Sequence, residues 1–136
     1  LEFRRVLFRS VLAGSLARFV LKPNRDWLVL RIARRFEAMM AQGGLEEVRS
    51  LGAIDPLLPA ARALGVPQLM AHLAGQITLD AAVEAAISDT RRYAKRQMTW
   101  FRHQMPDWSR IERSHPAEIL TVMLGAIDDG RADFPA

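Results

Sequence analysis

One long helical stripe near the carboxyl end constrains the fold of this chain more than any other feature. Apolar side chains recur at three- and four-residue spacing from Leu79 to Gln104, the pattern of one face of an α-helix. Thr78 is the expected amino-terminal cap, and Asp80 puts a negative charge in the first turn, where the helix dipole favours it. At 1.5 Å per residue this helix is about 39 Å long. The sequence therefore predicts a mainly α-helical fold built around one long helix.

Shorter elements are predicted on both sides of it. Residues 18–22 form a candidate strand that ends at Pro23, and an amphipathic helix follows over 27–40, capped by Asp26 and ended by the glycines of 42–44. The remaining expected elements are a helix over 45–51, a loop over 52–60, a helix over 67–73, a strand over 107–112 and a helix over 116–127. The prediction is a mainly α fold with one or two short strands.

Length and composition exclude several classes of protein. The chain has 136 residues, half of them hydrophobic, which suits one domain with a core. It has no cysteine, so disulfides and thiolate metal sites are excluded. No stretch approaches the roughly 18 apolar residues of a membrane span, and no membrane partner is expected. No metal site is predicted from the three histidines, which are dispersed without carboxylates at ligand spacing: His72, His103 and His115.

The first ten residues, LEFRRVLFRS, resemble the conceptual translation of a sequencing-adapter oligonucleotide, so we expect residues 1–10 to be non-native. Their apolar stretch is too short for a signal peptide. Without their three arginines and one glutamate, the formal charge of the chain falls from +4 to +2. Overall charge is therefore weak evidence for a nucleic-acid partner, and local clustering must carry that case. At the other end, residues 128–136 are expected to form a flexible tail.

Charge does cluster on the long helix, between residues 89 and 105. At 100° per residue, its cations fall on one face. That face consists of Arg91, Arg92, Lys95, Arg96, Thr99, Arg102 and His103. Burial of the opposite face, with Tyr93, Met98, Trp100 and Phe101, is expected to anchor the helix. Cations at fixed spacing suit the phosphates of a nucleic acid, but spacing alone also fits a solvated face or an anionic membrane surface.

The amino-acid sequence of this segment resembles that of a known family. The string DTRRYAKRQMTWFR, residues 89–102, resembles the carboxyl-terminal signature of tRNA dimethylallyltransferases, also called tRNA isopentenyltransferases. FVLKPNRDWLVLRIARRFEAMMAQGGLEEVRSL, residues 19–51, and ARALGVPQLMAHLAGQITLDAAVEAAI, residues 61–87, resemble other family segments in order and spacing. The resemblance covers residues 19–112.

The resemblance implies an activity and a fold. The family transfers a dimethylallyl group from dimethylallyl diphosphate to the adenosine 3′ of the anticodon in tRNA, uses Mg²⁺, and extrudes the adenine into a channel. The P-loop motif G-x-x-x-x-G-K-[ST] and the stretch with the family's catalytic acid do not occur in this sequence. Residues 11–127 are thus expected to be the helical carboxyl-terminal portion of a P-loop α/β transferase, inactive alone, with the Mg²⁺ site elsewhere. The full-length enzyme is expected to be a cytoplasmic monomer.

The resemblance also implies a residue near the chemistry. Arg35 matches the second arginine of the family's R-I-x-x-R segment, which is expected to reach the diphosphate, so Arg35 is the candidate catalytic residue. On the helical wheel it borders the apolar Leu28 and Met39, where an always-charged guanidinium could stabilise a leaving diphosphate. Arg31 is a supporting candidate for diphosphate binding. An arginine whose stem covers the core and whose head meets water is the alternative.

Two segments are expected to contact the anticodon arm of tRNA, positioning it more than reading its sequence. Their residues are Arg62, Ala63, Leu64, Gly65, Val66 and Pro67, followed by Thr90, Arg91, Arg92, Tyr93, Ala94, Lys95 and Arg96. Gly65 is expected to let the backbone approach a ligand, and Thr90 to bond a phosphate or sugar. The first segment is otherwise an ordinary helix-entry turn. For the whole chain, a free-standing helical RNA-binding module without catalysis is the alternative function.

Overall fold

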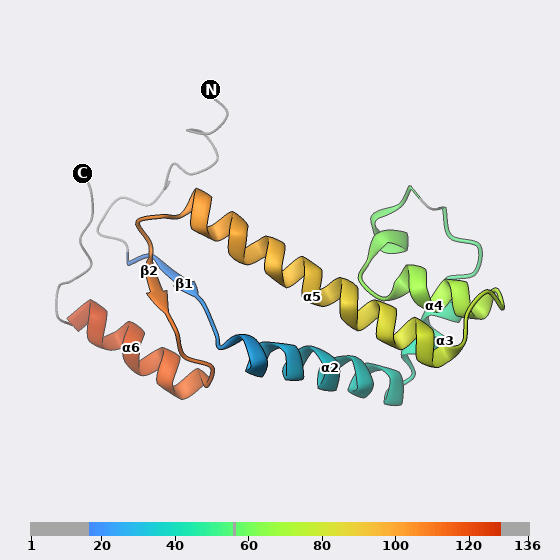
Figure 1. The fold of residues 1–136 in the computed structure, drawn as a ribbon, viewed down its shortest axis with the longest axis horizontal. Coiled ribbons are helices and arrows are strands. Elements are labelled where there is room, and N and C mark those ends of the chain that lie inside the picture. The colour runs from blue at the N-terminus through green and yellow to red at the C-terminus, as the bar shows by residue number, and fades with distance from the viewer. Residues whose placement is uncertain (1–16, 56, 129–136) are drawn as a thin grey trace, which may run out of the picture.

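A computed structural model describes residues 17–55 and 57–128, so the predictions for residues 1–10 and for the tail beyond 128 lie outside the described residues. Figure 1 shows its elements in space. In chain order they are β1 (Phe19–Leu21), α2 (Arg25–Ala41), α3 (Gly44–Ser50), the 3-10 turn η1 (Pro59–Arg62), α4 (Val66–Leu73), α5 (Leu79–Gln104), β2 (Ser109–Ile111) and α6 (Pro116–Asp128). The predicted mainly α fold with short strands is confirmed.

The helix α5 is the longest element, as predicted, and it runs along most of the molecule (Figure 1). It begins where the sequence indicated, because the Thr78 hydroxyl oxygen accepts a hydrogen bond from the backbone N–H of Ala81 at 3.2 Å. Asp80 lies in the first turn, and Arg102 and His103 lie in the last, so the charges at both ends complement the helix dipole.

The start of α2 corrects one prediction. The side-chain oxygen of Asn24 accepts hydrogen bonds from the backbone N–H groups of Asp26 and Trp27, at 2.9 and 3.1 Å. Asn24 is therefore the cap, and the prediction that Asp26 caps this helix was wrong. Asn24 has the non-helical backbone of a residue just before a helix, so its side chain faces the free N–H groups of the first turn, whereas Asp26 already lies within that turn. At the other end Gly43 adopts a φ of +95°, as a helix terminus with glycine allows.

Four helices meet in one hydrophobic core, at the end of the molecule where α3 and α4 lie (Figure 1). Phe36 from α2, Val48 from α3 and Leu69 from α4 pack with Ala82 and Ala86 of α5. The two alanines are one turn apart and fully buried, so their small side chains let the neighbouring helices approach α5 closely.

At the opposite end, a two-stranded parallel sheet joins the start of α2 to the end of α5 (Figure 1). Val20 pairs with Arg110, and the apolar Val20 and Ile111 are buried. The backbone N–H of Lys22 donates to the carbonyl of Ile111 at 2.9 Å, just beyond the paired residues. The helices α2 and α5 are thus held together at both ends, by the helical core and by the sheet.

The expected burial of the aromatic face of α5 is only partly correct. Met98 and Phe101 are half-buried, but Tyr93 is 44% exposed and Trp100 is 45% exposed, so the prediction that these two anchor the helix was wrong. The helices of the core pack on the amino-terminal half of α5, and the remainder of α5 is covered along one side only. Trp100 still packs edge-on against the ring of Phe101, with centroids 5.5 Å apart.

Candidate functional site

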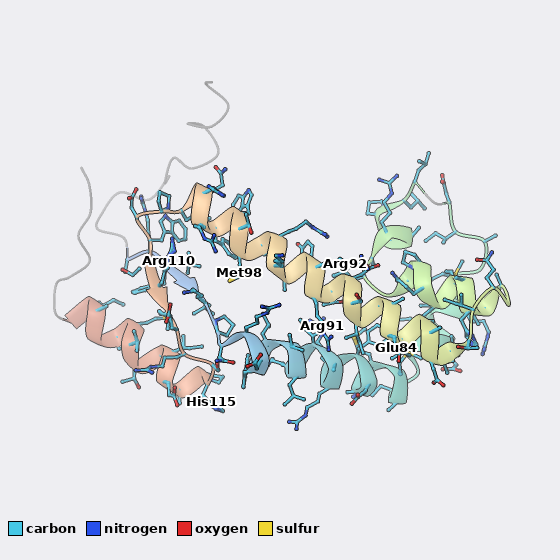
Figure 2. The ribbon with its side chains drawn as sticks, viewed as in Figure 1. Glu84, Arg91, Arg92, Met98, Arg110 and His115 are labelled. Atoms are coloured by element: carbon cyan, nitrogen blue, oxygen red, sulfur yellow. The ribbon has the colours of Figure 1, made fainter. Side chains whose placement is uncertain are left out.

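A groove of about 960 Å³ lies between α2, the sheet and α5. Its apolar lining includes Leu28, Val29 and Ile32 from α2 and Met98 and Phe101 from α5. Seven basic residues also line it: Lys22, Arg25, Arg91, Arg92, Lys95, Arg102 and Arg110. Figure 2 labels Arg91, Arg92 and Met98 along α5, and Arg110 on the neighbouring strand β2. The groove therefore combines an apolar surface with basic groups from both of its walls, α5 on one and the sheet with the start of α2 on the other.

Most of this positive charge is uncompensated. Lys22 pairs with Glu112 at the end of the sheet, and Arg92 pairs with Asp89 at 2.7 Å. Within the described residues the other five basic groups of the groove form no ion pair: Arg25, Arg91, Lys95, Arg102 and Arg110. Five such cations converging on one concave surface attract anions and hold them more strongly than cations scattered over a flat surface would.

The pair at the end of the sheet has one electrostatic consequence. A hydrogen bond from the Lys22 ammonium, together with its positive charge, lowers the pKa of the Glu112 carboxyl from its ordinary value, and the charge of Arg110 acts in the same direction. Both partners are well exposed to solvent, so water screens the pair. Because Lys22 is paired with Glu112, it is not one of the unpaired cations of the groove.

The structure brings together some of the predicted residues of α5. Arg91, Arg92, Ala94 and Lys95 line the groove. Arg96 does not line it, and its guanidinium lies 5.8 Å from the ring of Tyr93, in range of a cation–π contact. The cationic face predicted from the helical wheel therefore divides into a part within the groove and a part on the outer surface of α5.

Thr90 occupies neither part. Its hydroxyl donates a hydrogen bond to the backbone carbonyl of Ala86 at 2.8 Å, one turn earlier on α5. The proton of this hydroxyl is therefore committed to the helix. A phosphate oxygen can only accept a hydrogen bond, so Thr90 would have to break this bond before it could donate to a phosphate.

Arg35 and Arg31 lie outside the groove. Both side chains are exposed on α2, whereas the groove is lined by Leu28, Val29 and Ile32 of the same helix. The Arg31 guanidinium lies 5.1 Å from the centroid of the Trp27 ring. The structure thus separates the two arginines predicted to bind diphosphate from the cations of α5. Their predicted roles stay predictions.

His115, labelled in Figure 2 at the start of α6, adds a second contact to Trp27. The two rings meet edge-on, with centroids 6.5 Å apart. The contact joins the amino-terminal end of α6 to the first turn of α2. This contact lies outside the groove.

The segment from Arg62 to Pro67 also lies outside the groove, at η1 and the start of α4. Gly65 is buried with a φ of +97°, and a Cβ atom there would lie 2.8 Å from Cε2 of Phe36. The close approach that Gly65 permits in this structure is to a core side chain, and its expected approach to a ligand stays a prediction. Arg62, Leu64 and Pro67 are exposed.

Three basic residues of the groove were missed in the sequence: Lys22, Arg25 and Arg110. Lys22 directly follows β1, Arg25 begins α2 and Arg110 lies in β2, so none of them comes from the basic helix. The parallel register places Arg110 beside Val20 and so brings residues 20–25 next to the end of α5. That pairing joins segments about 90 residues apart, a separation over which no local pattern carries information.

The groove does not fit the Mg²⁺ ion that the resemblance implies. Mg²⁺ takes oxygen ligands, commonly from one or two carboxylates and from substrate phosphates. Among the residues that line the groove, Asp26 is the single acidic one, beside seven basic residues. In the described part of the chain, no group of three or more His, Cys, Asp or Glu side chains could hold a metal ion. No helix there is both long enough and apolar enough to cross a membrane.

Comparison with known proteins gives a consistent set of relatives. The family model described as IPP transferase matches residues 8–104. A tRNA dimethylallyltransferase of Dinoroseobacter shibae is 58% identical over 96 residues, which are 70% of this chain and 32% of the relative. One of Parvibaculum lavamentivorans is 46% identical over 121 residues, 88% of this chain and 38% of the relative. The chain therefore spans about a third of the length of these curated relatives.

Solved structures agree with the sequence relatives. A tRNA delta(2)-isopentenylpyrophosphate transferase from Staphylococcus epidermidis matches 96% of this chain and 43% of its own, with a TM-score of 0.73 and 26% sequence identity. A full-length tRNA isopentenylpyrophosphate transferase from Bacillus halodurans matches 93% of this chain and 42% of its own, with the same TM-score and identity.

Proposed function

The chain belongs to the IPP transferase family, and from this we propose that it forms the carboxyl-terminal part of an enzyme that transfers a dimethylallyl group from dimethylallyl diphosphate to tRNA. Its relatives carry the name tRNA dimethylallyltransferase, and the likeness to them extends over most of this chain but about a third of theirs. The P-loop and the Mg²⁺ site of such an enzyme would lie in the part that this chain does not span.

Within that enzyme, we assign to the groove the binding of tRNA phosphates. The observation that carries this assignment is the convergence of five unpaired cations on one concave surface. Arg91 and Lys95 lie one turn apart on α5, whose helical backbone fixes their spacing. Each phosphate they neutralise releases counterions, which favours binding at low salt. The apolar side chains beside them suit the sugar or base of a nucleotide, so the groove fits a nucleotide better than it fits a small inorganic anion.

The proposal gives Arg35 a separate role. Its match to the R-I-x-x-R segment and its exposed guanidinium support a contact with the diphosphate of the donor, made beyond the residues that line the groove. Arg31 would be held more firmly by its contact with Trp27 and would support that site. In this arrangement, Arg31 and Arg35 of α2 bind a different anion from the cations of the groove.

A chimaeric enzyme tests the proposed function. Residues 17–127 of this chain replace the matching carboxyl-terminal part of the Dinoroseobacter shibae relative, and the purified chimaera is incubated with dimethylallyl diphosphate, Mg²⁺ and tRNA. We expect tRNA to gain the mass of one dimethylallyl group at the adenosine 3′ of the anticodon. The same chimaera with Arg35→Ala should bind tRNA normally and transfer the group much more slowly.

The free-standing RNA-binding module is the alternative, and the basic groove that this chain forms by itself is the observation that favours it. The two functions differ in one requirement, because the transferase needs the amino-terminal part of the enzyme and the module does not. A folded chimaera that binds tRNA but never modifies it, beside an active parent enzyme, would favour the module. If the isolated chain binds no tRNA at low salt, the module is contradicted, and the chimaera remains the test of the transferase.

A further inference from the structure

A hydrogen-bonded chain links α4 to the groove through α5. The side-chain NH₂ of Gln68, on α4, donates to Oδ2 of Asp89 at 2.6 Å. The other carboxylate oxygen of Asp89, Oδ1, accepts from the Arg92 guanidinium at 2.7 Å. Arg92 in turn lines the groove. Asp89 is therefore bound on both of its oxygens, once from the core side and once from the groove side.

Chemistry dictates the orientation of the Gln68 amide. An ionised carboxylate can only accept hydrogen bonds, so Gln68 must direct its NH₂ group at Asp89. The amide oxygen, Oε1, is then buried and has no hydrogen-bond partner among the described residues. Buried carbonyl oxygens without a partner are uncommon in folded proteins and need an explanation. The hydrogen bond to Asp89 is kept although it leaves this oxygen unsatisfied.

We propose that Gln68 and Asp89 are positioning residues that hold the guanidinium of Arg92 in the groove in an orientation suited to a phosphate. The proposal rests on the phosphate-binding function proposed above for the groove. The side chain of Arg92 is 66% exposed and would otherwise sample many rotamers. Ordering such a side chain on binding opposes association. A guanidinium has five N–H donors, so the contact with Asp89 leaves others available to a phosphate.

The remaining basic residues of the groove on α5 provide the contrast. In the described residues Arg91 and Lys95 have no ion pair, and nothing holds their side chains in one rotamer. A change at Gln68 should therefore affect the contribution of Arg92 to binding and leave the contribution of Arg91 intact. Asp89 is a poor site for the test, because its replacement would also remove a negative charge that opposes RNA.

The test uses the 136-residue chain, a fluorescently labelled anticodon stem-loop RNA and Gln68→Leu, which changes no charge. We expect Gln68→Leu to raise the Kd by roughly two- to tenfold, the effect of ordering one long side chain on binding. The same substitution in an Arg92→Ala background should leave the Kd unchanged. In an Arg91→Ala background it should weaken binding by the same factor as in the parent chain.

Two controls separate positioning from general damage. Gln76→Leu makes the same chemical change at an exposed site outside the groove and should not alter the Kd. Thermal unfolding shows whether Gln68→Leu stays folded, and NMR of the arginine side chains in the free chain should show that Arg92 alone becomes more mobile. An equal loss of affinity with and without Arg92 would overturn the positioning role, as would an unchanged mobility of Arg92. If the parent chain binds no RNA, the function of the groove fails as well, which is a distinct result.

Discussion

Replacement of Gly65 by alanine isolates the contact on which the helical core depends. The new Cβ atom would lie 2.8 Å from Cε2 of Phe36, closer than such atoms approach in folded proteins, and 3.3 Å from Cζ, which is tighter than most real contacts. In addition, the φ of +97° disfavours any residue with a side chain. The left-handed backbone costs alanine about 1–2 kcal/mol, and overpacking against Phe36 adds about 1–3 kcal/mol. We expect Gly65→Ala to lower the free energy of unfolding by about 2–5 kcal/mol.

Gly75→Ala is the matched control. Gly75 has a φ of +73°, but nothing lies within 4 Å of where a Cβ atom would be. Alanine there is therefore disfavoured only by the left-handed backbone, which lowers the free energy of unfolding by about 1–2 kcal/mol. Urea unfolding followed by circular dichroism compares the two variants, and with an m-value of about 1–3 kcal/mol per molar urea their midpoints should be well separated. Phe36→Leu should recover part of the stability of Gly65→Ala. Equal losses for the two alanines would refute the close approach of Gly65 to Phe36.

Two further predictions concern the charges of the groove. Joint replacement of Arg91 and Lys95 by alanine should reduce the slope of log Kd against log salt for an anticodon stem-loop RNA by about 1.4–1.8, the value for two lost phosphate contacts, whereas Arg34→Ala, outside the groove, should leave it unchanged. By NMR, the pKa of the Glu112 carboxyl should lie below its ordinary value, and it should return toward that value in Lys22→Met, which removes the hydrogen bond and the charge that lower it. Because the folded-state pKa is lowered, the stabilising contribution of this pair is present above the unfolded-state pKa and is lost as the pH falls through the folded-state value. A Glu112 pKa that does not change in Lys22→Met would contradict the pairing.

Local chemistry made the helices predictable. The cap at Thr78 and the stripe that follows it identified α5 to within a residue, because both signals are contained in the helix itself. At α2 the sequence analysis took Asp26 as the cap, but Asn24 has the same kind of side chain and caps the helix in the structure. Single-residue boundaries of this kind are decided by geometry that composition does not contain.

The site was predictable only where it lies on one helix. The wheel placed Arg91 and Lys95 on a common face, and the structure puts both in the groove. It also assigned Trp100 to a buried face, but a helical wheel states which residues share a side and not whether a neighbour covers that side. Arg25 and Arg110 reach the groove through the pairing of β1 with β2, a contact between distant segments that the sequence does not reveal.

The two attachments that hold α2 against α5 differ greatly in strength. At one end four helices share a buried core, and at the other the connection is a sheet of three paired residues, with the hydrogen bonds and the exposed Lys22–Glu112 pair beside it. Thermal fluctuations will therefore separate the helices first at the strand end, with the core acting as the pivot. The amide protons of Lys22 and Ser109, which bond across the strands, should exchange with solvent sooner than those in the middle of α5. The groove beside the sheet would then widen and narrow before any ligand binds, which would ease the entry of the RNA proposed to bind there.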